Sequence, residues 1–490
     1  GTFALMSANV TTAADTYNTA VGHHAGASVT TGTNNTFVGG LAGDGTDNGA
    51  NNVAVGKSAL SANCGDNNTA IGAGALNATT GTDNTAVGKD AGVAVTSGQY
   101  NTLIGSLAGD ATTTGNNNVA MGYSSLTTNI ISDRNVAIGN FALATHNQAT
   151  SIDSYNISIG HASGESLTTG IQNTLIGGLA GDALTDVDYN VAVGTNALTS
   201  DTLGSKSVAI GRSALGNQNF TTATDTYNTA VGFEAGKALT NGTGNTFLGA
   251  EAGHDLASVN YNTAVGAFAL DLDSHGSRST AIGYAALSQQ DYGTTSTNTD
   301  NTAVGYLAGY FNSTGVDNTF VGTEAGEFNT TGNQQTFIGA YAGKGITGAK
   351  LTGLRNTAVG YAAGFKLQGA ASDSALLGYD AGYNITTALR STVLGSSAAT
   401  ALTEGNENVI VGYQAGTYGT ALTTGIRNCL FGAYTNTDAV GSEYANGFGY
   451  YIEAEAGYTT VGQASNDIRA AHGTATWLAV SDERYKKDIV

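Results

Sequence analysis

A chain of 490 residues has room for two to four globular domains, but its composition argues against them. Glycine accounts for 71 residues, proline is absent, 41% of the residues are hydrophobic and only 11% are charged. The net charge of −20 excludes the positive surface that nucleic-acid binding requires, and no stretch approaches the roughly 18 apolar residues of a membrane-spanning helix.

Residues 1–17 are expected to form an entry segment, and from residue 18 onward the chain is a repeat. Successive copies begin NTAVGHHAG (18–26), NTFVGGLAG (35–43) and NVAVGKSAL (52–60). The marker glycines that end the first part of each unit lie mostly 17 residues apart, from Gly22 to Gly432. About 24 copies of so short a unit predict a solenoid in which each copy forms one turn.

Each unit predicts a β-strand, because its apolar residues do not recur at helical spacing. In NTFVG, Thr36 and Val38 share one face of the strand and Phe37 lies on the other. We expect the marker glycine to permit a tight bend, the following xxAG or xxAL piece to form a second short strand, and a polar loop to close the turn. The predicted fold class is all-β, a parallel β-roll or β-solenoid over residues 18–432.

The thin core of a two-strand turn also predicts a partner chain. The apolar residue at the third position of each unit, such as Ala20, Phe37 or Leu103, is expected to face away from that core and to need cover. The Asn–x–Ala–Val/Ile–Gly core resembles the head repeats of trimeric autotransporter adhesins, whose left-handed β-rolls pack three to a rod. A homotrimeric rod is what this resemblance implies, whereas the need for some partner follows from the pattern.

A longer period overlies the short one. The motif LAGD recurs at 41–44, 107–110 and 179–182, and two turns ending in Ala–Leu follow each copy, so that the larger repeat contains four turns. Three long loops follow this period at 145–155, 217–227 and 289–300. We expect them to emerge from one corner of the solenoid.

Acidic and metal-ligating residues give little sign of chemistry. Asp44, Asp110 and Asp182 recur four turns apart, about 19 Å by ladder spacing, which is too far for the paired carboxylates of a polysaccharide hydrolase. Asp44 with Asp47 allows calcium binding, but a loop turn is the favoured interpretation. No cofactor and no metal are expected: the pair His23–His24 lacks a third ligand, and the two cysteines, Cys64 and Cys429, lack metal-site spacing.

Aromatic residues supply the candidate binding residues. Tyrosine occurs 23 times, often just after a marker glycine, where stacking between neighbouring turns is the favoured interpretation and stacking on sugar rings is the alternative. The repeat fades after Gly432, so residues 433–480 are predicted to form a non-repeat β tip or neck. The candidates in the long loops and the tip are Tyr155, Phe220, Tyr227, Tyr292 and Trp477.

The final segment, SDERYKKDIV (481–490), resembles the opening of the endosialidase-type intramolecular chaperone at the C-terminus of phage tail spikes and fibres. That family begins Ser-Asp-x-Arg-x-Lys-x-x-Ile, and its domain trimerises the fibre and then cleaves itself off. The resemblance implies that Ser481 is the nucleophile and Lys486 its base, with the scissile bond near Ser481–Asp482. A charged helix start with Ser481 as N-cap is the alternative. Ten residues do not form a complete protease.

These observations together predict a structural protein of the virion tail, outside the cell. We expect a homotrimeric phage tail fibre or spike shaft that contacts a host surface glycan or protein and other tail proteins, without membrane insertion. No enzyme activity is expected other than self-cleavage at the chaperone junction. The alternatives are a bacterial surface adhesin and a tailspike polysaccharide depolymerase.

Overall fold

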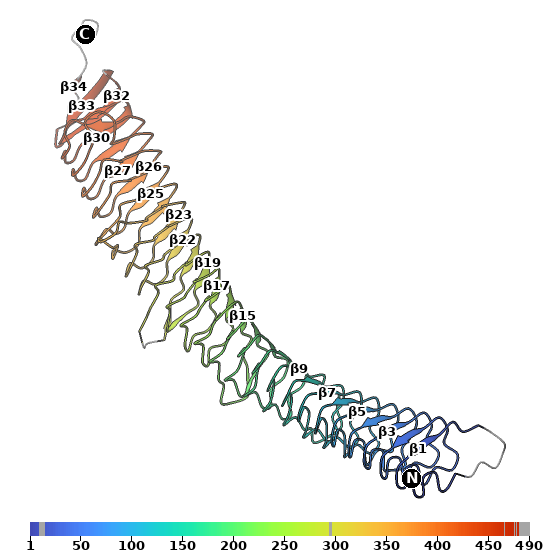
Figure 1. Cartoon of the computed structure of the whole chain (residues 1–490). Helices are drawn as coiled ribbons and strands as arrows, with labels where there is room; N and C mark the ends of the chain where they lie inside the picture. The colour runs from blue at the N-terminus through green and yellow to red at the C-terminus, as the bar shows by residue number, and fades with distance from the viewer. Residues whose placement is uncertain (9–14, 294–295, 465, 475, 477, 480–490) are drawn as a thin grey trace. The chain divides into compact units, whose positions relative to one another are not determined.

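A computed structural model describes residues 1–8, 15–293, 296–464, 466–474, 476 and 478–479. These residues form short strands and turns, with no helix among them, and they divide into two compact units, Gly1–Gly244 and Asn245–Val490. Each unit is a parallel β-solenoid (Figure 1), so the predicted fold class is confirmed. The described residues contain about 26 turns, compared with the 24 counted from the sequence.

In the first unit, one three-residue strand per turn pairs in parallel with the strand of the next turn. The register is regular: Thr36 pairs with Val53, Phe37 with Ala54 and Val38 with Val55. The strands are β1 (Thr19–Val21), β2 (Thr36–Val38), β3 (Val53–Val55), β4 (Thr69–Ile71), β5 (Thr85–Val87), β6 (Thr102–Ile104), β7 (Val119–Met121), β8 (Val136–Ile138), β9 (Ile157–Ile159), β10 (Thr174–Ile176), β11 (Val191–Val193), β13 (Val208–Ile210) and β15 (Thr229–Val231), with the two-residue strands β12 (Gly204–Ser205) and β14 (Thr224–Asp225).

The second unit repeats this ladder and ends differently. Its parallel strands are β16 (Thr246–Leu248), β17 (Thr263–Val265), β19 (Thr280–Ile282), β21 (Thr302–Val304), β22 (Thr319–Val321), β23 (Thr336–Ile338), β24 (Thr357–Val359), β25 (Ala375–Leu377), β26 (Thr392–Leu394), β27 (Val409–Val411), β28 (Cys429–Phe431), β30 (Asn446–Tyr450) and β32 (Tyr458–Gln463). The parallel ladder therefore continues through two strands beyond Gly432. Antiparallel β33 (Asn466–Ala471) and β34 (Leu478–Ala479) close it. Two further short strand pairs lie in the second unit: β18 (Gly276–Ser277) pairs with β20 (Thr297–Asn298), and β29 (Asn436–Thr437) pairs with β31 (Glu453–Ala454). The equivalent pair in the first unit is β12 with β14.

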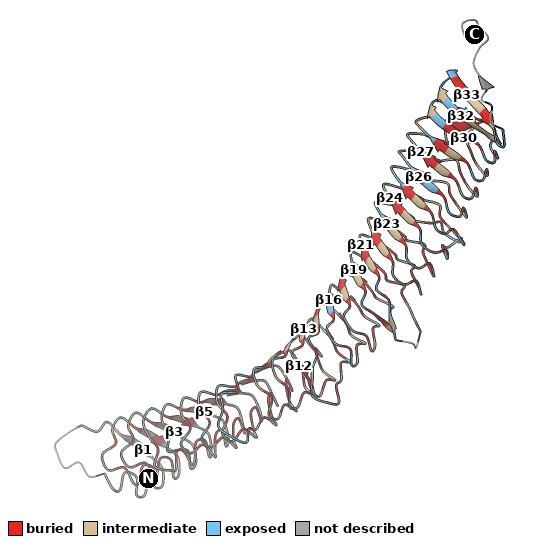
Figure 2. Ribbon diagram, turned by 180° about the vertical axis from the view of Figure 1, so that it is seen from behind, coloured by how far each residue is buried: buried red, intermediate tan, exposed pale blue. Residues whose placement is uncertain are grey.

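From β2 to β28, the middle residue of each three-residue strand is buried in the core, which corrects the expectation that it faces a partner; Ala20, in the first strand, is partly exposed. Phe37 and Leu103 are fully buried inside their own turns, whereas Val38 is 37% exposed. Figure 2 shows the same alternation along the strands of each unit. The thin-core argument placed the two faces the wrong way round: the outward face is the one that carries Thr36 and Val38.

The piece after the marker glycine is a turn and not the expected second strand. Residues 40–45 have the turn conformation throughout, with Leu41 and Gly43 at φ of 59° and 60°. Two left-handed residues within three positions reverse the chain and cannot belong to an extended strand. Each turn therefore contributes one strand to the main ladder, and its other sides are bends and loops.

The marker glycines are required by the close stacking of successive turns. A Cβ atom on Gly39 would lie 2.5 Å from the carbonyl oxygen of Gly56 in the next turn, and Gly39 has φ of 140°. A side chain is therefore excluded both by the neighbouring backbone and by the backbone conformation. This explains why the glycine recurs in nearly every unit.

The four-turn period follows from how the core is filled. The core of each turn is filled by the middle residue of its strand and by the residue six positions later. Where the first is large, as at Phe37, the second is a glycine, Gly43; where the first is Ala54, the second is Leu60. A third kind of turn has small residues at both places, as with Ala86 and Gly92.

The neighbours of such a turn fill its core from both sides. A Cβ on Gly92 would lie 2.6 Å from Leu103 Cδ1 in the following turn and 3.0 Å from Leu76 Cδ2 in the preceding one. Close packing therefore fixes the order of the turn types, because an unfilled turn needs large residues on both sides.

A column of buried asparagines holds the turns in register. Asn35 Nδ2 donates to the Gly49 carbonyl at 2.9 Å, and its Oδ1 accepts from the backbone N–H of Asn52 at 2.9 Å. The same pair of bonds recurs at Asn118, which donates to Ser132 O and accepts from Asn135 N. Asn35 and Asn118 thus satisfy a loop carbonyl within their own turn and an N–H of the next turn, whereas Asn52 makes only the second of these bonds.

Candidate functional site

The long loops fold back onto the turns before them. In the first unit, β14 in loop 217–227 pairs with β12, and Asp153 in loop 145–155 forms a bridge with Asp133. In the second unit, β20 in loop 289–300 pairs with β18. The loops are therefore attached to the solenoid along part of their length.

These loops display only some of the candidate aromatic residues. Tyr155 and Tyr227 are 50% and 60% exposed, whereas Phe220 is buried. Tyr292 is half-buried, and its hydroxyl donates to the Gly315 carbonyl at 2.7 Å. The expectation of four displayed rings is therefore corrected, because Phe220 and Tyr292 anchor their loops from inside.

The two exposed loop tyrosines are each held by a cation from the preceding turn. Lys206 Nζ lies 2.5 Å from Asp225 Oδ2 and 5.4 Å from the centre of the Tyr227 ring. Arg134 likewise pairs with Asp153 and lies over the ring of Tyr155. Hydrogen bonding to Lys206 lowers the pKa of the exposed Asp225. One face of each ring is thus occupied by the protein itself.

The repeated aspartates of the LAGD motif have structural partners. Ser61 Oγ donates to Asp44 Oδ1 at 2.6 Å, and Thr199 Oγ1 donates to Asp182 Oδ1 at 2.6 Å. The Thr127 hydroxyl donates to Asp110 in the same way. In each case the hydroxyl comes from the next turn, so these carboxylates join successive turns.

Tyrosine and phenylalanine rings stack from turn to turn, as the favoured interpretation predicted. Tyr284 and Tyr306 have ring centres 5.6 Å apart and nearly parallel planes, and Tyr361 and Tyr379 are 5.3 Å apart. These rings are about half exposed, so stacking leaves one side of each row open to solvent. The rows therefore stabilise the stack and also offer an aromatic surface.

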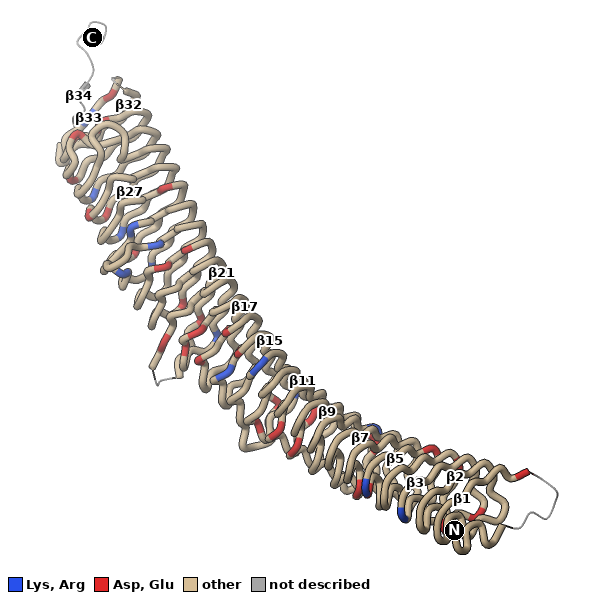
Figure 3. Tube along the Cα trace, viewed as in Figure 1, with Lys and Arg blue, Asp and Glu red and all other residues tan. Residues whose placement is uncertain are grey.

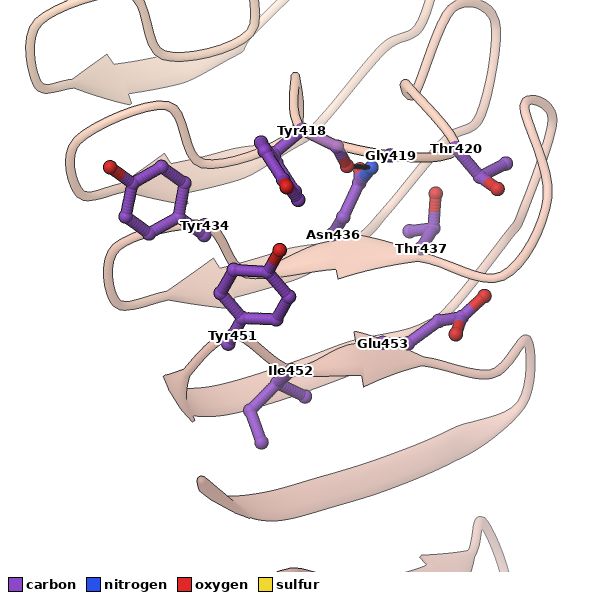
Figure 4. A pocket seen from close by; sticks show the side chains of 9 residues that line it. All are labelled: Tyr418, Gly419, Thr420, Tyr434, Asn436, Thr437, Tyr451, Ile452 and Glu453. Atoms are coloured by element: carbon purple, nitrogen blue, oxygen red, sulfur yellow. Dashed lines mark hydrogen bonds between the residues drawn. The ribbon is translucent and has the colours of Figure 1, made fainter. Parts of the chain in front are cut away.

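The densest aromatic cluster lies near the C-terminal end of the second unit and surrounds a pocket of about 250 Å³. Ring centres of Tyr418 and Tyr451 are 5.0 Å apart, and those of Tyr418 and Tyr434 are 5.3 Å apart. Figure 4 shows these three rings at one end of the pocket and Thr437 and Glu453 at the other. We call this the tyrosine pocket; its lining residues are Tyr418, Gly419, Thr420, Tyr434, Asn436, Thr437, Tyr451, Ile452 and Glu453.

The short strand pair β29–β31 forms the floor of the tyrosine pocket. Asn436 and Thr437 lie on β29, Glu453 begins β31, and both strands follow turns of the main ladder. Asn436 Nδ2 donates to the Tyr418 carbonyl and so connects the floor to the loop above. The Asn436 Oδ1 atom is buried without a hydrogen-bond partner among the described residues, which leaves an acceptor beside the pocket.

The electrostatics of the tyrosine pocket suit binding and not proton transfer. The neighbouring Tyr418 hydroxyl raises the pKa of Tyr451 to about 12, and burial raises that of Tyr434, so both phenols stay protonated at neutral pH. Glu453 is the only carboxylate of the lining, and glycoside hydrolysis needs two. Three aromatic faces with hydroxyl, amide and carboxylate groups can hold a flat or ring-shaped polar ligand.

Three of the predicted site residues cannot be placed. Trp477, Ser481 and Lys486 lie outside the described residues. Within the described ranges, no three histidine, cysteine or acidic side chains gather as a metal site would require. The same ranges hold no helix of the length and hydropathy needed to cross a membrane.

Comparison with protein-family profiles, curated proteins and solved structures finds no match to this chain. The site therefore rests on its own geometry. Sequence reasoning did not identify Tyr418, Tyr434 and Tyr451 as a group, since Tyr418 lies 16 residues before Tyr434 on a different turn. The available signal was the local density of tyrosine at 434, 444, 450 and 451.

Proposed function

We propose that this chain is the shaft of a homotrimeric phage tail fibre or tail spike, and that it attaches the virus particle to a host cell surface. The tyrosine pocket is the observation that carries the attachment role. It combines exposed aromatic rings with polar groups on a backbone held by the solenoid ladder, which is the combination that ligand-binding surfaces use.

The outward face of the strands supports the association of several chains. The third residue of many strands is apolar and partly exposed, with Val38 at 37%, Ile71 at 40% and Leu248 at 47%. A row of such side chains is large enough to favour contact with another chain. The sequence resemblance implies that the associated form is a homotrimer. We expect light scattering to give a molar mass of about three chains.

The depolymerase alternative has weaker support. Asp271 and Glu327 line a second pocket of the second unit, but the strands of their turns, β17 and β22, are three ladder steps apart. Three steps correspond to about 14 Å, whereas the carboxylates of glycosidases lie about 5–9.5 Å apart. A bacterial adhesin would be the same type of protein from a different source. Tail genes beside the gene for this chain would favour the phage tail fibre over the bacterial adhesin.

The attachment role is tested by binding of the fluorescently labelled protein to a panel of bacterial strains. Replacing Tyr434 and Tyr451 by alanine should abolish binding to strains that bind the wild type. The matched control is Tyr261→Ala, which removes a tyrosine that is 65% exposed and distant in sequence from the pocket. Equal binding by the double variant, or no binding of the wild type to any strain, would contradict the proposal.

The self-cleavage role of Ser481 and Lys486 is a separate part of the proposal. In a gene product that carries the chaperone domain after residue 490, Ser481→Ala or Lys486→Ala should leave that domain attached. Mass spectrometry of the purified protein measures this directly. A wild-type product that also stays uncleaved would remove self-cleavage from the proposal and leave attachment intact.

A further inference from the structure

A second pocket of the second unit lies on the aromatic surface and has an acidic end. It has a volume of about 480 Å³ and runs across the turns that follow β17, β19, β21 and β22. We call it the Asp271 pocket; its lining residues are Phe268, Asp271, Tyr284, Ala285, Ser288, Gln289, Leu307, Tyr310, Phe311 and Glu327. Phe268 and Tyr284 have ring centres 5.7 Å apart at a steep angle and form an aromatic wall near Asp271.

Asp271 is a half-buried carboxylate that has no lysine or arginine partner among the described residues. In the described part of the chain, no lysine or arginine forms an ion pair with it, and its side chain has no hydrogen-bond donor within reach. Burial raises its pKa to about 6; His254 acts in the opposite direction, and the nearby acids Asp255 and Glu251 add to the rise. The pocket wall therefore carries an uncompensated negative charge above that pH.

Elsewhere the protein places its own cation where an aromatic ring and a carboxylate meet. Lys344 pairs with Glu324 and Glu327, and its ammonium lies 5.5 Å from the centre of the Tyr341 ring. In the first unit, Arg212 pairs with Glu234 at 2.8 Å and lies 5.4 Å from the Phe233 ring centre. Figure 3 shows basic residues beside acidic ones at several points along the second unit.

The Asp271 pocket has the ring and the acid of this arrangement without the cation. Among the described residues, no lysine or arginine lies over Phe268 or Tyr284. At the far end, Glu327 is already paired with Lys344. The unpaired negative charge of the pocket is thus that of Asp271, at one end. An aromatic wall next to a carboxylate is the environment that recognises organic cations.

We propose that the Asp271 pocket binds an organic ammonium ion, with the charged nitrogen against Asp271 and the carbon skeleton on Phe268 and Tyr284. Ser288 and Gln289, on the turn between the two ends, are placed to hydrogen-bond hydroxyl groups of the same ligand. An amine-bearing sugar supplies all of these features. This site is separate from the tyrosine pocket and does not depend on the attachment role.

The proposal is tested by calorimetric titration of the full chain with three probes, at a pH above the pKa of Asp271 and below that of the probe amines, so that the carboxylate and the ammonium are both charged. A glucosamine oligomer carries amines on a sugar skeleton, its N-acetylated counterpart has the same skeleton without charge, and spermidine has ammonium groups without sugar. Binding of the glucosamine oligomer, of spermidine or of both supports the proposal and identifies the source of the ammonium. Equal affinity for the acetylated oligomer, or no binding of any probe, overturns it.

Two variants and a matched control connect binding to the pocket. Asp271→Asn keeps the shape of the side chain, and Tyr284→Leu removes the ring; each should weaken binding by about tenfold or more. Asp182→Asn is the control, since Asp182 has the same place in its own turn but has Leu179 in the place of Phe268, and Thr195 of the next turn in the place of Tyr284. Binding that is unchanged in Asp271→Asn overturns the proposal, and so does a loss in Asp182→Asn equal to that in Asp271→Asn.

Discussion

Phe337 and Gly343 compete for one volume in the core of the turn that contains β23. The Phe337 ring is fully buried, and a Cβ atom on Gly343 would lie 2.5 Å from Phe337 Cε2. In turns of the other kind the sizes are exchanged, as with Ala281 and Leu287. The two positions therefore form a pair whose total size is constrained.

Gly343→Leu should destabilise the protein by about 2–4 kcal/mol, because the added side chain overpacks the core beside Phe337. The double variant Phe337→Ala, Gly343→Leu recreates the Ala–Leu combination and should recover much of that loss. Denaturant unfolding of both variants measures the coupling. Gly40→Ala is the control, since nothing lies within 4 Å of a Cβ at that position. Additive effects of the two substitutions would contradict the exchange of sizes.

Asn118→Ala should cost about 2–4 kcal/mol of unfolding free energy, although the side chain touches no ligand. The variant leaves the buried Asn135 N–H without its acceptor and removes one of the two donors to the buried Ser132 carbonyl, which keeps the bond from Asn129 Nδ2. Asn241→Ala is the control, because Asn241 is exposed. If the two variants unfolded at the same denaturant concentration, the asparagine column would not hold the turns together.

Lys206→Met should loosen loop 217–227 without unfolding the solenoid. The substitution removes both the ion pair to Asp225 and the cation over Tyr227. Hydrogen exchange of residues 217–226 should become several-fold faster, while the midpoint of global unfolding should change little. Lys57→Met, at an exposed position, is the control. Unchanged exchange in the loop would show that the β12–β14 pair and the buried Phe220 hold it without the cation.

Stability of the second unit should fall as the pH rises through about 6, because burial raises the pKa of Asp273 from 3.8 to about 6. Hydrogen bonds from Gln290 and from the backbone of Gly276 and His275 act in the opposite direction, and Asp291 adds to the rise. A raised folded-state pKa stabilises the protein fully below the unfolded-state value, and this contribution is lost as the pH rises through the folded-state value.

The pH effect of Asp273 is on the order of 2–3 kcal/mol between about pH 4 and 6. Asp273→Asn should reduce the dependence of the unfolding free energy on pH over that range and leave the part that Asp271 contributes, as measured by denaturant titrations at several pH values. Asp90→Asn is the control. A variant that retained the wild-type slope would assign the pH dependence to another group.

The sequence predicted the fold because the determinants of the fold are local and repeated. The spacing of the marker glycines, the alternation in NTFVG and the absence of proline each indicate a stacked parallel ladder. The same pattern did not determine which face is inside. Phe37 alternates with Thr36 and Val38, and only the turn geometry at Leu41 and Gly43 shows that the chain closes around Phe37.

The candidate site was less accessible to sequence reasoning. Tyr155 and Tyr227 were found by their place in long loops, and both are exposed. Phe220 and Tyr292 have the same sequence context but turn inward, and this depends on side-chain packing that composition does not encode. The tyrosine pocket unites Tyr418 with Tyr451 across two turns, so it exists only once the stacking register is known.

The order of the turn types limits how many turns can be added or removed while the core stays closely packed. In a turn such as that of Ala86 and Gly92, the core is filled by the side chains of Leu103 from the following turn and Leu76 from the preceding turn. Insertion of a second turn with small residues at both places beside it would leave part of the core unfilled, because each of the two would lack a large neighbour on one side. From Phe37 to Gly309 the turn types recur in blocks of four. Insertion or loss of a whole block in this range preserves the type of each neighbouring turn and changes the length of the ladder by about 19 Å.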